Sequence, residues 1–484
     1  MHPRTRLYAA IGLLSALPAL TAATAFAADD GLDQRIARVE QGLLPAITLE
    51  GAPPARRKLA DEMARLGVPG VSIAVIHGGE VEWAKGYGTV TPGGAPVTVS
   101  TLFQAASISK PVAAMGALKM VEEGKLELDR DVNSYTGLWK LPKDADNNPV
   151  TLRQLLSHTA GTTVHGFPGY AAGAPVPTLL QLLNGAKPAN TGGVHVSSRP
   201  GSRWRYSGGG YEVAQYVMME RSKTSFAELM QDKVLKPLAM TDSTFAQPLA
   251  PSLLQRAALP HDRSGKPIPG GPHTYPEQAA AGLWTTPSDL AKFAIETRRA
   301  AAGQSNAVLS QAMTHLMLTP VLQNYGLGLG IDGDGQTQSF GHGGSNAGYR
   351  ARMTAYTERG DGIVVMTNGD GGDELAGELV RAVAAEYGWP TMGAKVRRNV
   401  PLTAEALATV PGRYVIAGAG DFTIRRAGNG LVVDLQEGAS ETLLAAPSGS
   451  YFVQSSEAEL QFTGRDGGRL VSGSFDMPFT RAKE

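Results

Sequence analysis

The chain contains no cysteine. This absence excludes disulfide bonds, thiolate metal sites and a cysteine nucleophile, and it excludes a lipid anchor on an N-terminal cysteine. The 484 residues, of which 42% are hydrophobic, must instead be stabilised by burying a large core. An exported globular protein that needs no disulfide fits this composition.

No charge of either sign is in excess, because 44 Lys and Arg residues balance 44 Asp and Glu residues. Basic stripes and interleaved basic and aromatic residues are absent, so we expect no nucleic-acid partner. We predict no cofactor and no metal site. His158, His165 and His195 lie in predicted loops without ligand-like spacing, and we interpret them as structural or solvent-exposed.

The apolar stretch at the N-terminus is short. Arg4 and Arg6 precede an apolar run over residues 7–20, and Ala25-Phe26-Ala27 fits a small-x-small cleavage site. Residues 1–27 are therefore predicted to be a cleavable signal peptide. The alternative is an uncleaved membrane anchor, which the shortness of the run disfavours. We expect a periplasmic or secreted protein without a membrane span after signal removal.

The first two thirds of the chain alternate between strand and helix signals. Residues 28–68 have an amphipathic helical pattern, and two strands are predicted at 70–76 and 81–87 around a glycine turn. Residues 112–300 are predicted to be mainly helical with long loops. Within them, Thr286-Pro287-Ser288-Asp289 predicts a helix start, with an N-cap, proline at the first position and an early acid.

Strand signals return at residues 325–331, 349–355 and 362–368, and a helix is predicted at 373–387. Strands from both ends of this unit therefore flank a helical middle. That order predicts an α+β fold, in which an antiparallel sheet is flanked by helices and joined to a helical subdomain.

The pattern changes near the C-terminus to short alternating strands. Hairpins are predicted at 422–435, around Gly428-Asn429-Gly430, and at 460–474. These signals indicate a small all-β barrel or sandwich. We divide the chain into a signal peptide (1–27), a main domain (28–392), a linker (393–402) and a C-terminal β domain (403–484).

Candidate catalytic residues start with Ser107, which is followed three positions later by Lys110 in the chain's one S-x-x-K motif. Positions i and i+3 lie on one face of a helix, so the hydroxyl and the amine are expected side by side at a helix start. A weak nucleophile needs such a base within hydrogen-bond reach.

Two later segments carry further candidates. Tyr206 lies in a glycine-rich loop, where its phenol can accept or relay a proton or where it is simply a turn residue. Residues 340–346 are predicted as a strand edge on which Gly343 and Gly344 let a substrate backbone approach. The N–H groups of Ser345 and Ser107 are then candidate oxyanion donors.

Taken in this order, the three motifs resemble those of the serine hydrolases of the β-lactamase and penicillin-binding-protein superfamily, particularly the class C β-lactamase-related branch. The resemblance covers about residues 55 to 390 and extends to segments 151–161, 236–244 and 281–290. It implies a β-lactamase/transpeptidase-like fold. The C-terminal unit is similar to the lipocalin-like domain often appended to these enzymes.

The resemblance implies that Ser107 is the nucleophile and that Lys110 and Tyr206 form the base system. Free amines and phenols have pKa values of about 10, so the pKa of one of the two groups must be lowered for it to act near neutral pH. The nearby lysine charge would lower that of the phenol. Which of the two takes the serine proton stays open. Substrate binding is implied for a further set of residues: Gly208, His342, Gly344, Ser345, Asn346 and Arg350.

Two positions depart from the family's pattern. The family usually has Asn two residues after the Tyr, where this chain has Gly208, and Lys at the start of the third motif, where it has His342. A neutral histidine gives no permanent anchor for a carboxylate, although Arg350 or Arg352 are possible replacements. The histidine form is more similar to the superfamily's esterases and D-amino-acid peptidases than to resistance enzymes.

We therefore expect a hydrolase that forms an acyl-Ser107 intermediate with a small ester, a D-amino peptide or a β-lactam. One alternative is a true β-lactamase or penicillin-binding D-Ala-D-Ala carboxypeptidase. An alternative of another class is a non-catalytic protein that binds peptides or peptidoglycan on the same fold. A further possibility gives the C-terminal β unit a role as a partner interface in an oligomer.

Overall fold

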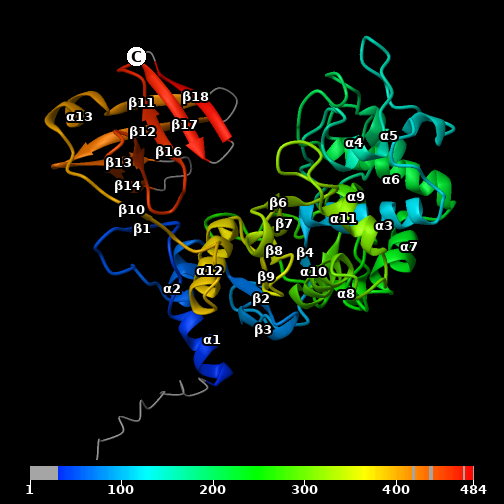
Figure 1. Cartoon of the computed structure of the whole chain (residues 1–484), viewed down its shortest axis with the longest axis horizontal. Coiled ribbons are helices and arrows are strands. Elements are labelled where there is room, and N and C mark those ends of the chain that lie inside the picture. The colour runs from blue at the N-terminus through cyan, green and yellow to red at the C-terminus, as the bar shows by residue number, and fades with distance from the viewer. Residues whose placement is uncertain (1–30, 417–419, 435–439, 473–474, 483–484) are drawn as a thin grey trace, which may run out of the picture.

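The computed structural model describes residues 31–416, 420–434, 440–472 and 475–482. The predicted signal peptide lies outside these residues. Figure 1 shows a body of helices and sheet, with a C-terminal barrel at its upper left and a helical subdomain at its upper right. Of the helices in the described ranges, none is long and apolar enough to cross a membrane.

The main domain is built on a six-stranded antiparallel sheet with the order β3-β2-β9-β8-β7-β6. Its strands are β2 Gly70–His77, β3 Glu80–Gly88, β6 Gly330–Asp332, β7 Ser339–Asn346, β8 Tyr349–Tyr356 and β9 Gly362–Thr367. In β2, Val71, Ile73 and Val75 pack into one core, and Ala74 and Ile76 pack into another. Because side chains alternate along a strand, the sheet is covered on both faces.

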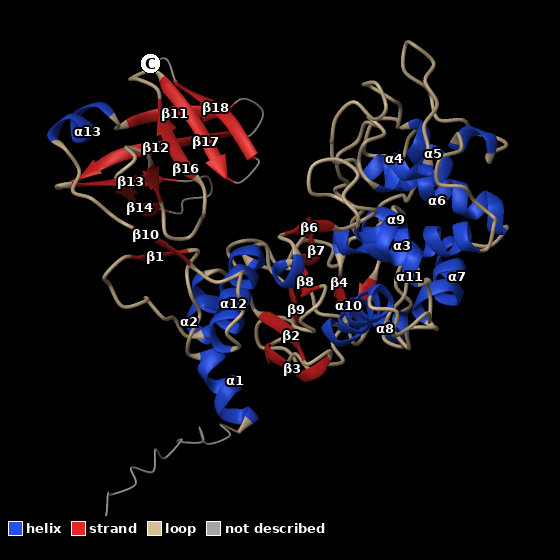
Figure 2. Ribbon diagram, viewed as in Figure 1, coloured by secondary structure: helices blue, strands red, loops and turns tan. Residues whose placement is uncertain are grey.

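Helices form the two outer layers (Figure 2). Helices α1 Leu32–Glu40, α2 Leu59–Arg65 and α12 Gly372–Glu386 share a core with one face of the sheet. Helix α10 Pro287–Ala301 covers the other face and begins as predicted, with the Thr286 side chain accepting the backbone N–H of Asp289.

The helical subdomain packs on the α10 side of the sheet and shares its core. Its helices are α3 Ser109–Glu122, α4 Leu152–Leu156, α5 Leu179–Asn184, α6 Gly208–Ser222, α7 Phe226–Met230, α8 Pro251–Leu254, α9 Gln278–Ala281 and α11 Gln311–Leu318. Short turns are η1 Ala106–Ile108, η2 Val132–Ser134, the π-helical η3 Gln231–Leu235 and η4 Gly335–Thr337, and two short strands pair as β4 Phe103–Gln104 with β5 Trp284–Thr285.

The C-terminal unit is a closed eight-stranded barrel preceded by α13 Ala404–Thr409. Its strands are β11 Gly412–Ile416, β12 Gly420–Ala427, β13 Gly430–Asp434, β14 Ser440–Ala445, β15 Tyr451–Phe452, β16 Glu459–Phe462, β17 Gly467–Ser472 and β18 Phe475–Arg481. Both predicted hairpins are present, as β12 with β13 and β16 with β17. The predicted α+β fold class with an all-β C-terminal domain is confirmed.

Two predicted elements differ from the structure. The amphipathic region 28–68 is interrupted by β1 Ile47–Leu49, which pairs in parallel with β10 Lys395–Arg397 inside the predicted linker. A partner so distant in sequence leaves no local periodicity. The strand predicted at 325–331 is reduced to its end, because Gly328 has a φ of +94° and packs tightly on Ala114 and α3, which turns the chain.

Candidate active site

Ser107 lies in the short turn η1, immediately before α3. Ala106, the residue before it, has a φ of +48°, a conformation that costs energy for a side chain with a Cβ. Ser109 locks this turn, since its hydroxyl donates to the Ala106 carbonyl at 2.6 Å and accepts the Leu283 N–H at 2.9 Å. The turn therefore holds Ser107 at the start of α3, where the first backbone N–H groups have no partner within the helix.

The structure brings Ser107, Lys110 and Tyr206 together. The Lys110 side chain is buried, and its ammonium donates to Ser107 Oγ at 3.0 Å and to the Ala280 carbonyl at 2.8 Å. The ring of Tyr206 lies beside it, with its centroid 4.9 Å from Nζ. A hydroxyl, an amine and a phenol in this arrangement can transfer a proton away from Ser107.

Aromatic side chains surround this group. His158 lies 4.2 Å from Tyr206 between ring centroids, and Tyr325 lies 5.0 Å from His158. Burial, followed by the charge of Lys110, holds the pKa of His158 well below its usual value, so the ring is neutral. Its Nδ1 accepts the N–H of Ser207 at 3.1 Å, and the neutral ring therefore carries its proton on Nε2.

Sequence reasoning did not place His158 or Tyr325 beside Tyr206. Of the two interpretations given for His158, structural or solvent-exposed, the structure fits the first, because the ring is buried with its centroid 4.2 Å from that of Tyr206. A signal was available in its position inside the family-like segment 151–161. His165 lies 5.0 Å from Tyr206, whereas the exposed His195 bonds to its own loop.

Strand β7 lies against η1, the turn that carries Ser107. Gly344 touches Ala105, and an added Cβ would collide with the Ala105 carbonyl oxygen. Strand β8 pairs with β7 along one side as far as Asn346. On the other side, β6 pairs with β7 only as far as Gly341, so within the described chain residues 342–346 have no strand partner on that side. Such an edge offers free backbone donors and acceptors, and the predicted oxyanion donor Ser345 lies on it.

His342 shares a face of β7 with Gly344 and lies 6.1 Å from Tyr206 between ring centroids. Burial, with the nearby Lys110 charge as the second cause, lowers the pKa of His342 to about 4. The imidazole is therefore neutral at pH 7 and supplies no fixed positive charge for a substrate.

Asn346 and Arg350 use their polar groups within the protein. The buried Asn346 amide donates to Gln104 Oε1 at 2.7 Å. The Arg350 guanidinium donates to the Asn346 carbonyl at 2.7 Å and pairs with Asp370 at 2.9 Å. Both residues thus fix the end of β7, whereas Arg352 is exposed.

Gly208 begins α6, two residues after Tyr206. An added Cβ would lie 2.8 Å from the Phe167 ring and 3.2 Å from the His165 carbonyl oxygen. The Phe167 ring therefore occupies the space into which a side chain at this position would extend.

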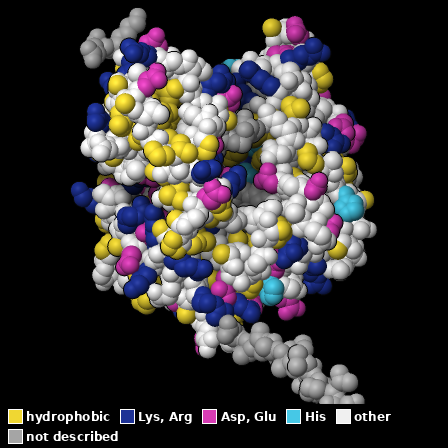
Figure 3. All heavy atoms as spheres, turned by 60° about the vertical axis from the view of Figure 1, so that its left-hand side comes forward, with side chains coloured by type: hydrophobic (Ala, Val, Ile, Leu, Met, Phe, Trp, Pro, Cys, Tyr) yellow, Lys and Arg dark blue, Asp and Glu magenta, His cyan; other side chains and the backbone are white. Residues whose placement is uncertain are grey.

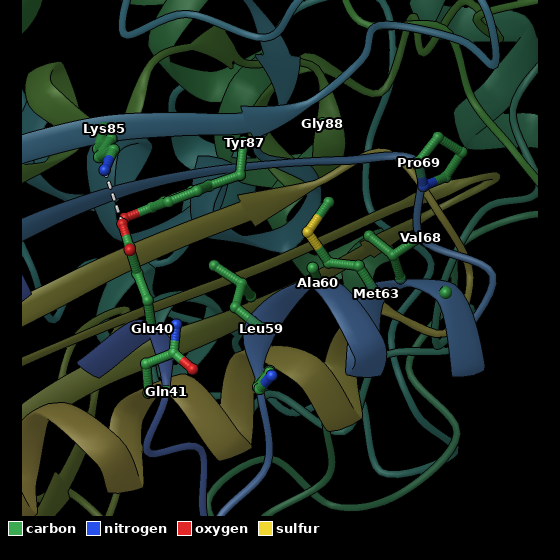
Figure 4. A pocket seen from close by; sticks show the side chains of 12 residues that line it. Glu40, Gln41, Leu59, Ala60, Met63, Val68, Pro69, Lys85, Tyr87 and Gly88 are labelled. Atoms are coloured by element: carbon green, nitrogen blue, oxygen red, sulfur yellow. Dashed lines mark hydrogen bonds and ion pairs between the residues drawn. The ribbon is translucent and has the colours of Figure 1, made fainter. Parts of the chain in front are cut away.

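A separate pocket of about 580 Å³ lies at the opposite edge of the sheet, between α1, α2 and β3 (Figure 4). Its wall is mostly apolar, and Lys85 pairs with Glu40 across it at 2.6 Å. The sheet order places β3 at one edge and β7 toward the other, so this pocket is not part of the Ser107 site. In the described ranges, no group of three acidic or histidine side chains is placed to hold a metal.

The model of the family described as Beta-lactamase matches residues 55–387. The chain belongs to the beta-lactamase family. A curated relative, Protein flp of Staphylococcus aureus (strain MRSA252), is 27% identical over 222 residues, which are 46% of this chain and 42% of that protein. The chain thus spans less than half of that relative's length.

Solved structures share the fold of this beta-lactamase family member. The octameric penicillin-binding protein homologue from Pyrococcus abyssi matches with a TM-score of 0.60 and 23% identity, over 88% of this chain and 95% of that one. The D-amino acid amidase from Ochrobactrum anthropi SV3 matches with a TM-score of 0.54 and 23% identity, over 68% and 97%. The predicted resemblance to this serine hydrolase superfamily is confirmed.

Proposed function

We propose that the protein is an exported serine hydrolase that cleaves ester or amide bonds through an acyl-Ser107 intermediate. The observation that carries this proposal is the 3.0 Å hydrogen bond from Lys110 to Ser107 Oγ beside the Tyr206 ring. A binding protein would have no use for a buried amine bonded to a serine hydroxyl. Export rests on the predicted signal peptide.

In the first step, Ser107 Oγ attacks the substrate carbonyl carbon while its proton passes to the Lys110 and Tyr206 pair. The backbone N–H groups of Ser107 and Ser345 stabilise the negative charge on the carbonyl oxygen. The same pair returns the proton to the leaving alcohol or amine as its bond to carbon breaks. Water then attacks the acyl-enzyme and releases the acid and free Ser107.

Small esters and D-amino peptides are the proposed substrates. The Phe167 ring beside Gly208 supports an ester, since no amide stands there to hold a substrate peptide group, and the neutral His342 supports a substrate that has no carboxylate to anchor. The proposal of D-amino peptides rests on the similarity of the histidine form to the superfamily's D-amino-acid peptidases. The space-filling view shows a hollow near the middle of one face, with side chains of both charges at its rim (Figure 3).

The test compares hydrolysis of a chromogenic short-chain ester by the mature protein and by Ser107→Ala. We expect the variant to lose about 1,000-fold or more in kcat, because no other group replaces the nucleophile. Ser100→Ala, which changes an exposed serine upstream, should leave kcat unaltered. Full activity in Ser107→Ala would overturn the proposal. D-aminoacyl amides and a chromogenic cephalosporin then define the substrate range.

A further inference from the structure

A buried carboxyl group that the proposed mechanism does not use lies behind Lys110. Glu212 is 0% exposed and projects from α6. Its Oε1 accepts the backbone N–H of Ala280 at 3.1 Å. The carbonyl of the same Ala280 accepts from the Lys110 ammonium at 2.8 Å. One residue of α9 is thus held by Glu212 on one side and holds the catalytic lysine on the other.

Helix α9 depends on such outside support. It has only four residues, so its first N–H groups have no acceptors within the helix, and the residue before it provides no side-chain cap. The acceptors come instead from α6, where Gln215 Oε1 takes the N–H of Ala279 at 2.7 Å and Glu212 takes that of Ala280. Residues 212 and 215 are three apart and share one face of α6.

We propose that Glu212 is a positioning residue of the active site. By holding Ala280, it fixes the carbonyl oxygen that receives Lys110, and it thereby keeps the lysine ammonium against Ser107. Glu212 touches none of the reacting atoms. The inference rests on the proposed acyl-serine mechanism.

The length of the Glu212 side chain, which brings an acceptor oxygen to the Ala280 N–H, gives it this role, and its charge does not. The charged groups that act on it are Glu277, from the turn before α9, and Lys110, from α3. Burial, followed by the neighbouring Glu277, holds the pKa of Glu212 well above its usual value, which favours the neutral carboxyl. A neutral acceptor of the same length should therefore do the same work.

Three variants separate reach from charge. Glu212→Gln keeps the acceptor at the same distance, Glu212→Asp keeps an acid but is one methylene shorter, and Glu212→Leu removes the acceptor. The readouts are kcat and KM for the ester and the maximal rate at which a fluorophosphonate probe modifies Ser107. We expect Gln to behave like wild type and Asp and Leu to lose about 10- to 100-fold in kcat and labelling rate, with KM unchanged.

Glu296→Leu is the matched control, because the buried Glu296 of α10 likewise accepts a backbone N–H, that of Ala307, at 3.1 Å. All rates are normalised to the concentration of folded protein. If Glu212→Leu does not fold, the comparison of Glu212→Asp with wild type decides the outcome. Wild-type rates in Asp and Leu, or a loss in Gln equal to that in Leu, would overturn the positioning role. A wild-type protein that neither labels nor hydrolyses would instead overturn the proposed function, and this role with it.

Discussion

Among the described residues, no carboxylate is bonded to Lys110. A buried ammonium needs compensation, and here it comes from Ser107 Oγ, the Ala280 carbonyl and the Tyr206 ring face. The same charge contributes, after burial, to the low pKa of His158 and His342. Both imidazoles near the lysine are therefore neutral.

Glu277 makes the stability of the protein depend on pH. Burial raises the pKa of its carboxyl to about 8 from the usual 4.5. The folded protein therefore retains a proton that the unfolded chain has lost, and stability falls as pH rises from 4.5 through 8. We expect Glu277→Gln to remove this fall and to gain on the order of a few kcal/mol at pH 8.5 relative to pH 5.

Urea unfolding of both proteins at the two pH values measures the effect. Glu80→Gln, at an exposed carboxyl at the start of β3, is the control and should show no such gain. If the free energy of unfolding changed with pH by the same amount in wild type and in Glu277→Gln, the role of Glu277 would be contradicted.

At the scale of elements, the contact of β7 with η1 sets the geometry of the proposed oxyanion site. The strand carries Ser345 and the turn carries Ser107, so their two N–H groups converge only if strand and turn touch. Gly344 permits that contact, because its Cα lies against the Ala105 carbonyl with no room for a side chain. Glycine is required here by close approach, not by an unusual φ.

Gly344→Ala should therefore push β7 away from η1. We expect kcat for the ester to fall about 100-fold, since a displacement of about 1 Å at a reacting centre has effects of this size. Gly330→Ala on the neighbouring strand β6 is the control, because the atom nearest to its added Cβ is the Gly341 carbonyl oxygen at 3.6 Å, an ordinary contact distance. Equal kcat values for the two variants would show that the contact does not set the oxyanion site.

At the scale of the whole molecule, the barrel is joined to the hydrolase domain through β1 and β10 (Figure 1). The buried Phe452 of the barrel packs on Ala46 and Ile47, and Ile47 donates its N–H to the Gln454 carbonyl at 3.0 Å. Two ion pairs from β10, Lys395 to Glu457 and Arg397 to Glu459, support this junction. The segment predicted to be a linker thus also forms part of a docking surface.

Phe452→Ala should loosen this junction. Truncating a buried phenylalanine costs about 3–5 kcal/mol, so we expect a separate, lower calorimetric transition for the barrel and faster proteolysis within residues 393–402. Ester kcat should not change, because the Ser107 site is built from η1, α3, α6 and β7. Val415→Ala, at a partly exposed barrel position, is the control. An unchanged single transition in Phe452→Ala would contradict the junction's role.

Local sequence determined the elements whose signals are contiguous. The hairpin around Gly428-Asn429-Gly430 and the N-cap at Thr286 follow from turn and capping chemistry within a few residues. The S-x-x-K spacing likewise placed Ser107 beside Lys110, since three residues of helical chain bring two side chains together wherever the helix lies.

Only the tertiary structure decided the surroundings of that pair. His158, Tyr325 and Glu212 come from segments far apart in the sequence, and their roles depend on burial and on which neighbour each one faces. The pairing of β1 with β10 and the turn at Gly328 likewise depend on distant partners. Sequence thus determined which groups can react, and long-range packing, which leaves no local periodicity, decided how their charges and positions are controlled.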